Sequence, residues 1–362
     1  MSISHTLISS PDWTSATPTL AHFPDSNHQD ESHTNALHCL KVTTKYVISG
    51  SADRSIRIWD KKARTLALPP LVGHSGTVVA LDVSKLLALL FSGDSNGEVI
   101  IWDFETGDMV QRFEKAHSDT VLDLAFKGGY LVTAGRDKSI KVWRFRESGE
   151  FELKHLLLGH EMPVLHVQIW GDGTRAVSTS GDRTLRVWDL GSGECVRRID
   201  GVAKAIVGFR FFETGGGTCL VAACTDHRIR IYNFEDGRKV ASLEGHENVV
   251  RAVKMVESGN GQGRSRWIIS ASYDGTVRVW EEDGLGRWTN IRTHSFSEAV
   301  LTQIPDFSYV PAEDGFLQVK QKPSRISDME VDEGCMYCCG EGKEIVCWDF
   351  RGDNKETESK SG

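Results

Sequence analysis

The sequence predicts an all-β protein made of seven similar four-stranded units, and three observations support this prediction. Six tryptophans and one tyrosine each close a short apolar stretch, and they recur every 41 to 48 residues apart from one longer final interval. Each stretch follows a tight polar turn and alternates apolar with polar residues, as a half-buried strand does. A Gly-His pair or a lone His precedes most copies. Repeats of this length are typical of a β-propeller with four strands per blade.

Each of the seven copies predicts the third strand of one blade, together with the turn before it. In chain order the copies are SADRSIRIWD (51–60), SNGEVIIWD (95–103), GRDKSIKVWR (135–144), SGDRTLRVWD (180–189), TDHRIRIYNF (225–234), SYDGTVRVWE (272–281) and EGKEIVCWDF (341–350). The fifth copy stays in register with Tyr232 in place of Trp. The long interval before the seventh copy indicates an insertion at residues 295–324.

The copies resemble the WD-repeat family, and the resemblance covers residues 33–350. Four positions recur together: a His in the loop before the innermost strand, a Ser or Thr on the second strand, an Asp in the next turn and the Trp. The resemblance implies that these four side chains form a hydrogen-bonded set in each blade. The complete sets are His33, Ser49, Asp53 and Trp59; His117, Thr133, Asp137 and Trp143; His160, Ser178, Asp182 and Trp188; and His246, Ser270, Asp274 and Trp280.

Three copies depart from this pattern. The second has His74, Ser92 and Trp102, with Asn96 where Asp is expected. The fifth retains only Asp226, and the seventh retains only its Trp. The residues at the other positions are Val202, Ala222 and Tyr232 in the fifth copy, and Lys322, Cys338 and Gly342 in the seventh. Apolar packing is expected to replace the missing hydrogen bonds.

The recurring His, Ser and Asp residues do not indicate a hydrolase. A catalytic triad occurs once in a chain, whereas this set recurs at the spacing of the blades. Buried polar groups are costly unless they are hydrogen-bonded, and the set satisfies its own members. We therefore interpret it as structural and expect a protein without catalytic activity.

Composition restricts the function classes further. The net charge of −8 argues against a general nucleic-acid surface. The sequence contains no run of about 18 apolar residues, so we expect no segment to span a membrane. The amino terminus lacks a basic start followed by an apolar core, which favours a cytoplasmic or nuclear location. Cys335 and Cys338 form a Cys-X-X-Cys motif, but they should point to opposite faces of one strand. Free thiols and no metal or cofactor are expected.

The chain is expected to form one propeller at residues 33–350, followed by a disordered tail at 351–362. The sequence after Trp348 is too polar to supply an outer strand for the last blade. Residues 1–32 are therefore expected to hold a closing strand, best matched by Thr17–Phe23, and a polar connector. The insertion at 295–324 contains several apolar residues and leaves two alternatives open: it packs over one face of the ring, or it folds only with a partner.

The resemblance also implies where a partner binds. In this family the loops before the innermost strands and those between the second and third strands open on one face, called the top. The family's binding positions lie just before the turn Asp and around the start of the inner strand. Carried over to this chain, the preferred candidates are Arg136, Tyr273, Arg251, Val79, Leu122, Leu165, Val207 and Arg325. Aromatic and Arg residues amid apolar neighbours are typical of interaction hot spots.

We therefore expect a monomeric, non-catalytic scaffold that binds a protein or peptide on its top face within a larger complex, without direct contact to nucleic acid. Stretches such as STSGDRTLRVWD and ISASYDGTVRVWE particularly resemble the propellers of F-box/WD-repeat ubiquitin-ligase receptors, whose top-face arginines hold phosphorylated peptides. No F-box segment precedes the first copy, so a substrate-recognition role in a ligase assembly is an alternative. A propeller enzyme and a component of an RNA-processing or chromatin assembly are further alternatives.

Overall fold

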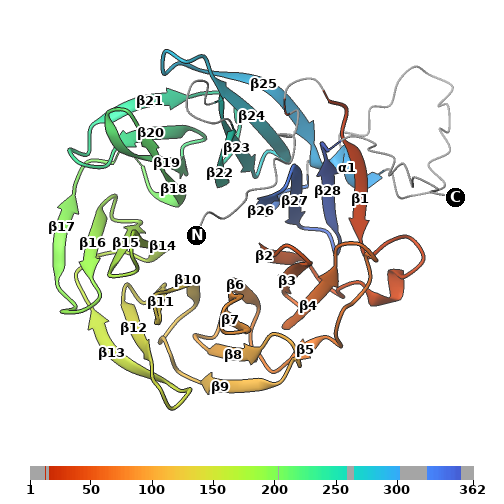
Figure 1. The fold of residues 1–362 in the computed structure, drawn as a ribbon, viewed down its shortest axis with the longest axis horizontal. Coiled ribbons are helices and arrows are strands. Elements are labelled where there is room, and N and C mark those ends of the chain that lie inside the picture. Colours follow the sequence, from red (N-terminus) through yellow and green to blue (C-terminus); the bar gives the residue numbers. More distant parts are fainter. Residues whose placement is uncertain (1–12, 14–15, 203, 259–264, 302–323, 352–362) are drawn as a thin grey trace, which may run out of the picture.

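The computed structural model describes residues 13, 16–202, 204–258, 265–301 and 324–351. These residues form seven antiparallel sheets of four strands, arranged as a ring around a central channel (Figure 1). The innermost strand of each sheet lies beside the channel, and the outermost lies at the rim. The predicted seven-bladed propeller is confirmed.

Blades are numbered in the chain order of their innermost strands. Blade 1 comprises β2 (Leu37–Val42), β3 (Tyr46–Ser51), β4 (Ser55–Asp60) and β5 (Leu71–Val72), and blade 2 comprises β6 (Val78–Ser84), β7 (Leu89–Asp94), β8 (Val99–Asp103) and β9 (Met109–Phe113). Blade 3 comprises β10 (Val121–Lys127), β11 (Tyr130–Gly135), β12 (Ile140–Phe145) and β13 (Phe151–Leu157), and blade 4 comprises β14 (Val164–Trp170), β15 (Arg175–Ser180), β16 (Leu185–Asp189) and β17 (Cys195–Ile199).

Blades 5 to 7 follow the same order, except that the last blade takes its outer strand from the other end of the chain. Blade 5 comprises β18 (Ile206–Thr214), β19 (Gly217–Cys224), β20 (Ile229–Asn233) and β21 (Lys239–Leu243), and blade 6 comprises β22 (Val250–Ser258), β23 (Ser265–Ser272), β24 (Thr276–Glu282) and β25 (Trp288–Ser295). Blade 7 comprises β26 (Ile326–Asp332), β27 (Cys335–Gly340), β28 (Ile345–Asp349) and β1 (Thr19–Phe23). The described helices are η1 (Gln29–Glu31) and α1 (Phe296–Leu301), and no helix among the described residues is long and apolar enough to cross a membrane.

The apolar core lies between neighbouring blades, because the second strand of each sheet is covered on both faces. Every residue of β7 and of β27 is buried. Between blades 1 and 2, Ile48 packs with Leu90 and Trp102 in one apolar cluster. Full burial of one such aliphatic side chain contributes roughly 1.5–3 kcal/mol. Each blade is therefore held in place by the blades on either side of it.

The ring is closed by pairing between the two ends of the chain. Strand β1 pairs antiparallel with β28, from Thr19 opposite Asp349 to Phe23 opposite Ile345. Phe23 is only 2% exposed and lies 6.1 Å from the Tyr337 ring, measured between ring centroids. The predicted closing strand is confirmed, and it covers an edge of β28 that would otherwise be a template for association.

In blade 7, the place that a His occupies in the regular blades is taken by Phe296, at the start of the predicted insertion. Phe296, the first residue of α1, is fully buried and packs against blade 7. A Cβ on Gly340 would lie 3.3 Å from the Phe296 ring, whereas on Gly135, the equivalent residue of blade 3, it would lie 2.3 Å from His117. An aromatic ring thus lies beside the strand where blade 3 has its imidazole. Residues 302–323 of the insertion, the Lys322 position included, lie outside the described residues.

Blade 5 also replaces the missing hydrogen bonds with apolar packing, and the two cysteines of the Cys-X-X-Cys motif lie as the sequence predicts. Val202, Ala222 and Tyr232 all belong to the buried cluster between blades 4 and 5. Cys335 packs toward blade 1 and Cys338 toward blade 6, so the two thiols point to opposite faces of β27 as the alternation of a strand requires.

Deletion of residues 1–30 is expected to lower the melting temperature, because β28 loses its partner strand and blade 7 loses Phe23. The point variant Phe23→Ala should lower the free energy of unfolding, measured by urea denaturation, by about 3–5 kcal/mol. Leu20→Ala is the control, since Leu20 lies on the same strand but is 40% exposed, and it should cost less than about 1 kcal/mol. Equal costs for the two variants would contradict closure by β1.

Candidate binding face around the central channel

Every innermost strand begins with a β-bulge. In blade 1 the register between β2 and β3 shifts between Leu37 and Cys39, and the other six blades show the same shift at the equivalent place. A bulge leaves one extra residue unpaired and re-aims its side chain. The seven bulged residues, which we call the bulge ring, are His38, Val79, Leu122, Leu165, Val207, Arg251 and Ser327.

All seven residues of the bulge ring are half-buried and line one cavity at the centre of the propeller. The ring has two chemically different parts. Blades 2 to 5 supply an aliphatic arc, and blades 6, 7 and 1 supply a polar arc of Arg251, Ser327 and His38. Burial, followed by the nearby charge of Arg251, lowers the pKa of His38, so Arg251 carries the positive charge of the polar arc at neutral pH.

The cavity beneath the ring holds only about 80 Å³. Pockets for small organic ligands usually measure about 300–1,000 Å³. A ligand would therefore lie across the mouth of the channel and insert single side chains, instead of being enclosed.

The residues just before the turn Asp positions lie next to the entry loops of the inner strands. In blade 3 the Arg136 N–H donates to the Thr120 carbonyl, and in blade 6 the Tyr273 N–H donates to the Val249 carbonyl, at 2.8 and 3.0 Å. The equivalent bond forms in each of the other blades, with Ala52, Ser95, Gly181, Thr225 and Glu341 as donors. These bonds bring the two sets of predicted binding positions together on one face.

The structure groups some predicted anchors and separates another. The Arg325 guanidinium lies over the Tyr273 ring at 5.6 Å, so blades 6 and 7 join these residues beside the polar arc. Arg136 lies in blade 3, beside the aliphatic arc, with a 62% exposed side chain. Arg136 and Arg325 face carboxylates of Asp119 and Glu341 at 4.0 and 3.6 Å, whereas Arg251 forms no ion pair with a described residue.

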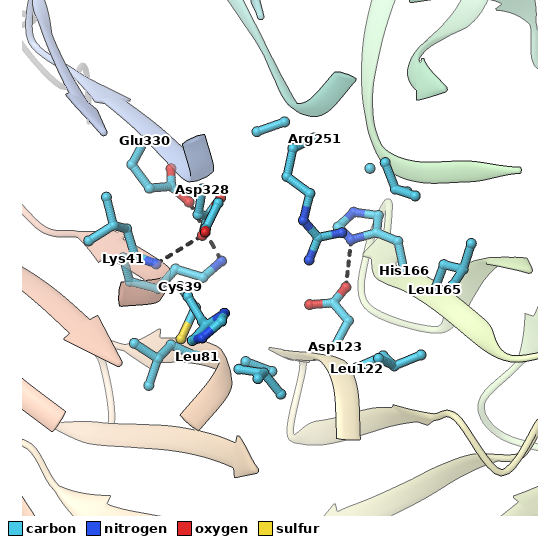
Figure 2. Close-up of a pocket in the computed structure, with 18 of the residues that line it drawn as sticks. Cys39, Lys41, Leu81, Leu122, Asp123, Leu165, His166, Arg251, Asp328 and Glu330 are labelled. Carbon is cyan, nitrogen blue, oxygen red and sulfur yellow. Dashed lines mark hydrogen bonds and ion pairs between the residues drawn. The ribbon is translucent and has the colours of Figure 1, made fainter. Parts of the chain in front are cut away.

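A layer of charged side chains lies deeper in the channel and was not predicted from the sequence. Figure 2 shows Asp123 and His166 on one side of the cavity and Lys41, Asp328 and Glu330 on the other. His166 Nδ1 lies 2.6 Å from Asp123 Oδ2, and Lys254 Nζ lies 2.6 Å from Glu330 Oε2. Positive and negative groups are interspersed, so this layer offers no single-sign binding site.

Two aspartates of this layer join neighbouring blades through the backbone. Asp123 of blade 3 accepts the Val167 N–H of blade 4 at 2.9 Å, and Asp328 of blade 7 accepts the Leu40 N–H of blade 1 at 2.9 Å. Both follow directly after a bulged residue, which is the sequence signal that identifies them. Burial raises the pKa of Asp123, but the charge and hydrogen bond of His166 outweigh it and lower the pKa overall.

The four regular sets form a continuous chain of hydrogen bonds. In blade 1, His33 Nδ1 lies 2.8 Å from Asp53 Oδ2, His33 Nε2 lies 2.9 Å from Ser49 Oγ, and the Trp59 indole N–H donates to Ser49 Oγ at 2.9 Å. Blades 3, 4 and 6 repeat this arrangement. Ser49 is fully buried, so its hydroxyl is not available to a substrate.

Blade 2 differs from the sequence interpretation. Asn96 does not face His74; its side chain donates to Ser75 Oγ at 3.0 Å. The carboxylate beside His74 belongs to Asp94, two residues earlier, at 3.3 Å from Nδ1. Aligning blade 2 with the regular blades assigns the partner of His74 to Asn96, because Asn96 occupies the aligned position. The carboxylate that lies beside His74 comes from a different position in the turn. In blade 5, Asp226 instead holds Arg230 through two hydrogen bonds of 2.7 and 2.5 Å.

A closed ring of seven four-stranded blades, with apolar and polar residues at the mouth of its channel, defines a β-propeller. A family model described as "WD domain, G-beta repeat" matches residues 25–60, 66–103, 107–144, 151–189 and 237–281, which is more than half of the chain. The chain belongs to the WD40-repeat family.

Curated relatives share only parts of this chain. The nuclear distribution protein PAC1 of Arthroderma otae is 31% identical over 143 residues, and a p21-activated protein kinase-interacting protein 1-like of Gallus gallus is 31% identical over 135. These matches cover 36% and 37% of this chain and 30% and 35% of the relatives, so the chain matches about a third of their length. The WD40 β-propeller domain of Doa1 has a TM-score of 0.68 at 17% identity, covering 91% of this chain and 95% of that one.

Asp182→Asn is expected to lower the free energy of unfolding at pH 7 by about 1–3 kcal/mol, because the buried donors around it lose an ionised acceptor. Burial raises the pKa of Asp182, but the hydrogen bonds from His160, Thr184 and the backbone outweigh it and lower the pKa to about 2. The carboxylate therefore contributes fully above about pH 5, and its contribution is lost between about pH 4 and 2. Urea denaturation at several pH values measures the free energies of unfolding of the parent chain and the variant, and the difference between them should become smaller in acid.

Asp172→Asn is the matched control in the same blade, because Asp172 is exposed and its side chain accepts hydrogen bonds from Thr174 in its own turn. It should cost less than about 0.5 kcal/mol. If Asp182→Asn costs no more than this control at pH 7, the regular sets are not structural elements of the blades.

Proposed function

We propose that this protein is a non-catalytic scaffold that binds a protein or peptide across the mouth of its central channel. The observation that carries the proposal is the bulge ring, which turns one side chain from every blade toward the same point. Binding sites commonly occur on loops that a rigid scaffold holds in place, and here the residue at the mouth differs from blade to blade. The family resemblance to interaction modules supports the same reading.

The two arcs of the bulge ring define the chemistry of the partner. The aliphatic arc of Val79, Leu122, Leu165 and Val207 favours an apolar side chain inserted from above. The polar arc favours an acidic group beside Arg251, because this guanidinium lines the cavity and forms no ion pair with a described residue. An acidic or phosphorylated residue next to an apolar anchor satisfies both requirements through one charge-assisted contact and one buried contact.

Arg136 and Arg325 are secondary contacts in this proposal. Each already faces a carboxylate on the exposed surface, where an ion pair contributes little and can be exchanged for one with a partner. Tyr273 beneath Arg325 supplies a flat apolar surface beside the polar arc. A role in recognising substrates for a ubiquitin ligase is the second candidate, favoured by the same Arg251, which forms no ion pair with a described residue.

Arg251→Glu is expected to lower affinity for the specific partners at least tenfold, or about 1.4 kcal/mol, because it places a negative charge where the acidic group binds. The measurement is quantitative affinity capture from a cell lysate on the immobilised full chain, with half of the lysate treated with phosphatase. Binding that falls after this treatment identifies a phosphorylated partner, and binding that persists identifies a carboxylate-bearing one.

The control is Arg238→Glu, which makes the same charge change on a 76% exposed side chain. Arg238 lies in the loop between β20 and β21, at the opposite end of the strands from the bulges. Melting temperatures of both variants should equal that of the parent chain. Retention of every specific partner by a folded Arg251→Glu chain would refute the proposed site.

A further inference from the structure

We propose that blade 2 holds a first-row divalent cation, with Zn²⁺ as the best fit, on His74, Asp94 and Glu98. One ligand atom from each residue lies within 4.8 Å of those of the other two. All three residues are buried, with exposed fractions of 7%, 0% and 6%. They lie outside the bulge ring, so the proposal is independent of the proposed function.

Blade 2 carries carboxylates at two turn positions where blades 1, 4 and 6 carry hydroxyls. The positions of Asp94 and Glu98 are taken by Ser51 and Ser55 in blade 1, and by serine or threonine in blades 4 and 6 as well. Two buried carboxylates are costly unless positive charge accompanies them. Arg112 donates to Glu98 Oε1 at 2.7 Å, and it is the cation that pairs with these carboxylates among the described residues. Asp94 pairs with no Lys or Arg among the described residues, and His74 is the titratable group beside it.

His74 points an unpartnered nitrogen into this cluster. Its Nε2 lies 2.6 Å from Ser92 Oγ, and that hydroxyl is placed to donate its single proton to the Ile100 carbonyl at 3.2 Å. In the tautomer that binds a cation, Nε2 carries the imidazole proton and donates to Ser92, which leaves the lone pair on Nδ1 for the metal. Nδ1 is buried, and its contact with Asp94 Oδ2 at 3.3 Å does not meet hydrogen-bond geometry. In that tautomer the lone pair faces the Asp94 carboxylate, and a cation between the two atoms would satisfy both.

The distances distinguish this arrangement from the regular blades. In those four blades the distance from His Nδ1 to Asp is 2.8–3.1 Å and meets hydrogen-bond geometry. In blade 2, Nδ1 and Asp94 Oδ2 are 3.3 Å apart without that geometry. Two ligands bound to tetrahedral Zn²⁺ at about 2.0–2.1 Å would be about 3.3–3.4 Å apart. The observed separation is that of two ligands sharing one metal.

The other side-chain contacts hold the ligands in place. Asp94 Oδ2 accepts the Gly76 N–H at 2.9 Å, and Glu98 Oε2 accepts the Ser75 N–H at 3.0 Å, so each oxygen keeps a free lone pair. The bond from His74 to Ser92 orients the imidazole, as the outer partner of a metal-bound His usually does. Imidazole with two carboxylates suits Zn²⁺ and its first-row neighbours. The cation would fasten the turn at Asp94–Glu98 to the entry loop of β6.

The test uses Co²⁺ as a spectroscopic probe on the full chain after removal of metal by dialysis against a chelator. The wild-type chain should bind one Co²⁺ with the visible absorption of a low-coordinate site, and Zn²⁺ should displace it. Glu98→Gln keeps the size of the side chain but removes a ligand charge, and it should weaken Co²⁺ binding at least about tenfold. Glu344→Gln is the matched control, because Glu344 holds the same turn position in blade 7.

A wild-type chain that binds no stoichiometric Co²⁺, or equal affinities for the two variants, would overturn the proposal. X-ray absorption at the zinc edge of the wild-type chain covers the case in which Glu98→Gln does not fold. Nitrogen and oxygen ligands at about 2.0–2.1 Å support the site. Sulfur ligands at about 2.3 Å would assign the zinc to cysteines and overturn it.

Discussion

The pairing of β1 with β28 is the constraint on which the rest of the structure depends. Each blade buries its two faces only because a neighbour stands on either side, and this is possible for all seven blades only in a closed ring. Closure brings the seven bulges to one mouth, and it sets Asp328 of blade 7 against the backbone of blade 1. The proposed binding face is therefore a property of the closed ring, and no single blade contains it.

Much of this architecture follows from the sequence because its signals are local and repeated. The spacing of the Trp positions predicts the number of blades, and the polar tail after Trp348 predicts that the closing strand comes from the amino terminus. The bulge positions could be named as well, because the resemblance to the WD-repeat family places binding positions around the start of each inner strand. The structure adds the reason for their importance, which is that the bulge directs each side chain into the channel.

The features that the sequence does not predict depend on contacts between distant segments. Phe296 stands beside Gly340 in the place that His117 occupies in blade 3, although it belongs to the segment before blade 7. Asp94 takes the place beside His74 that aligned positions assign to Asn96. The charged layer of the channel combines residues from several blades, so no single repeat contains its pattern. In blades 2 and 7 the same place in the blade is occupied, but by a residue from another position in the sequence.

The central claim is that a partner binds across the bulge ring, and amide hydrogen exchange of the partner complex tests it most directly. Our account predicts that binding slows exchange at the first residues of the inner strands β6, β10, β14, β18 and β22 and in the turns beside them. The loops at the opposite end of the strands, such as that between β20 and β21, should exchange as in the free chain. Protection confined to those loops or to the outer strands would contradict the account.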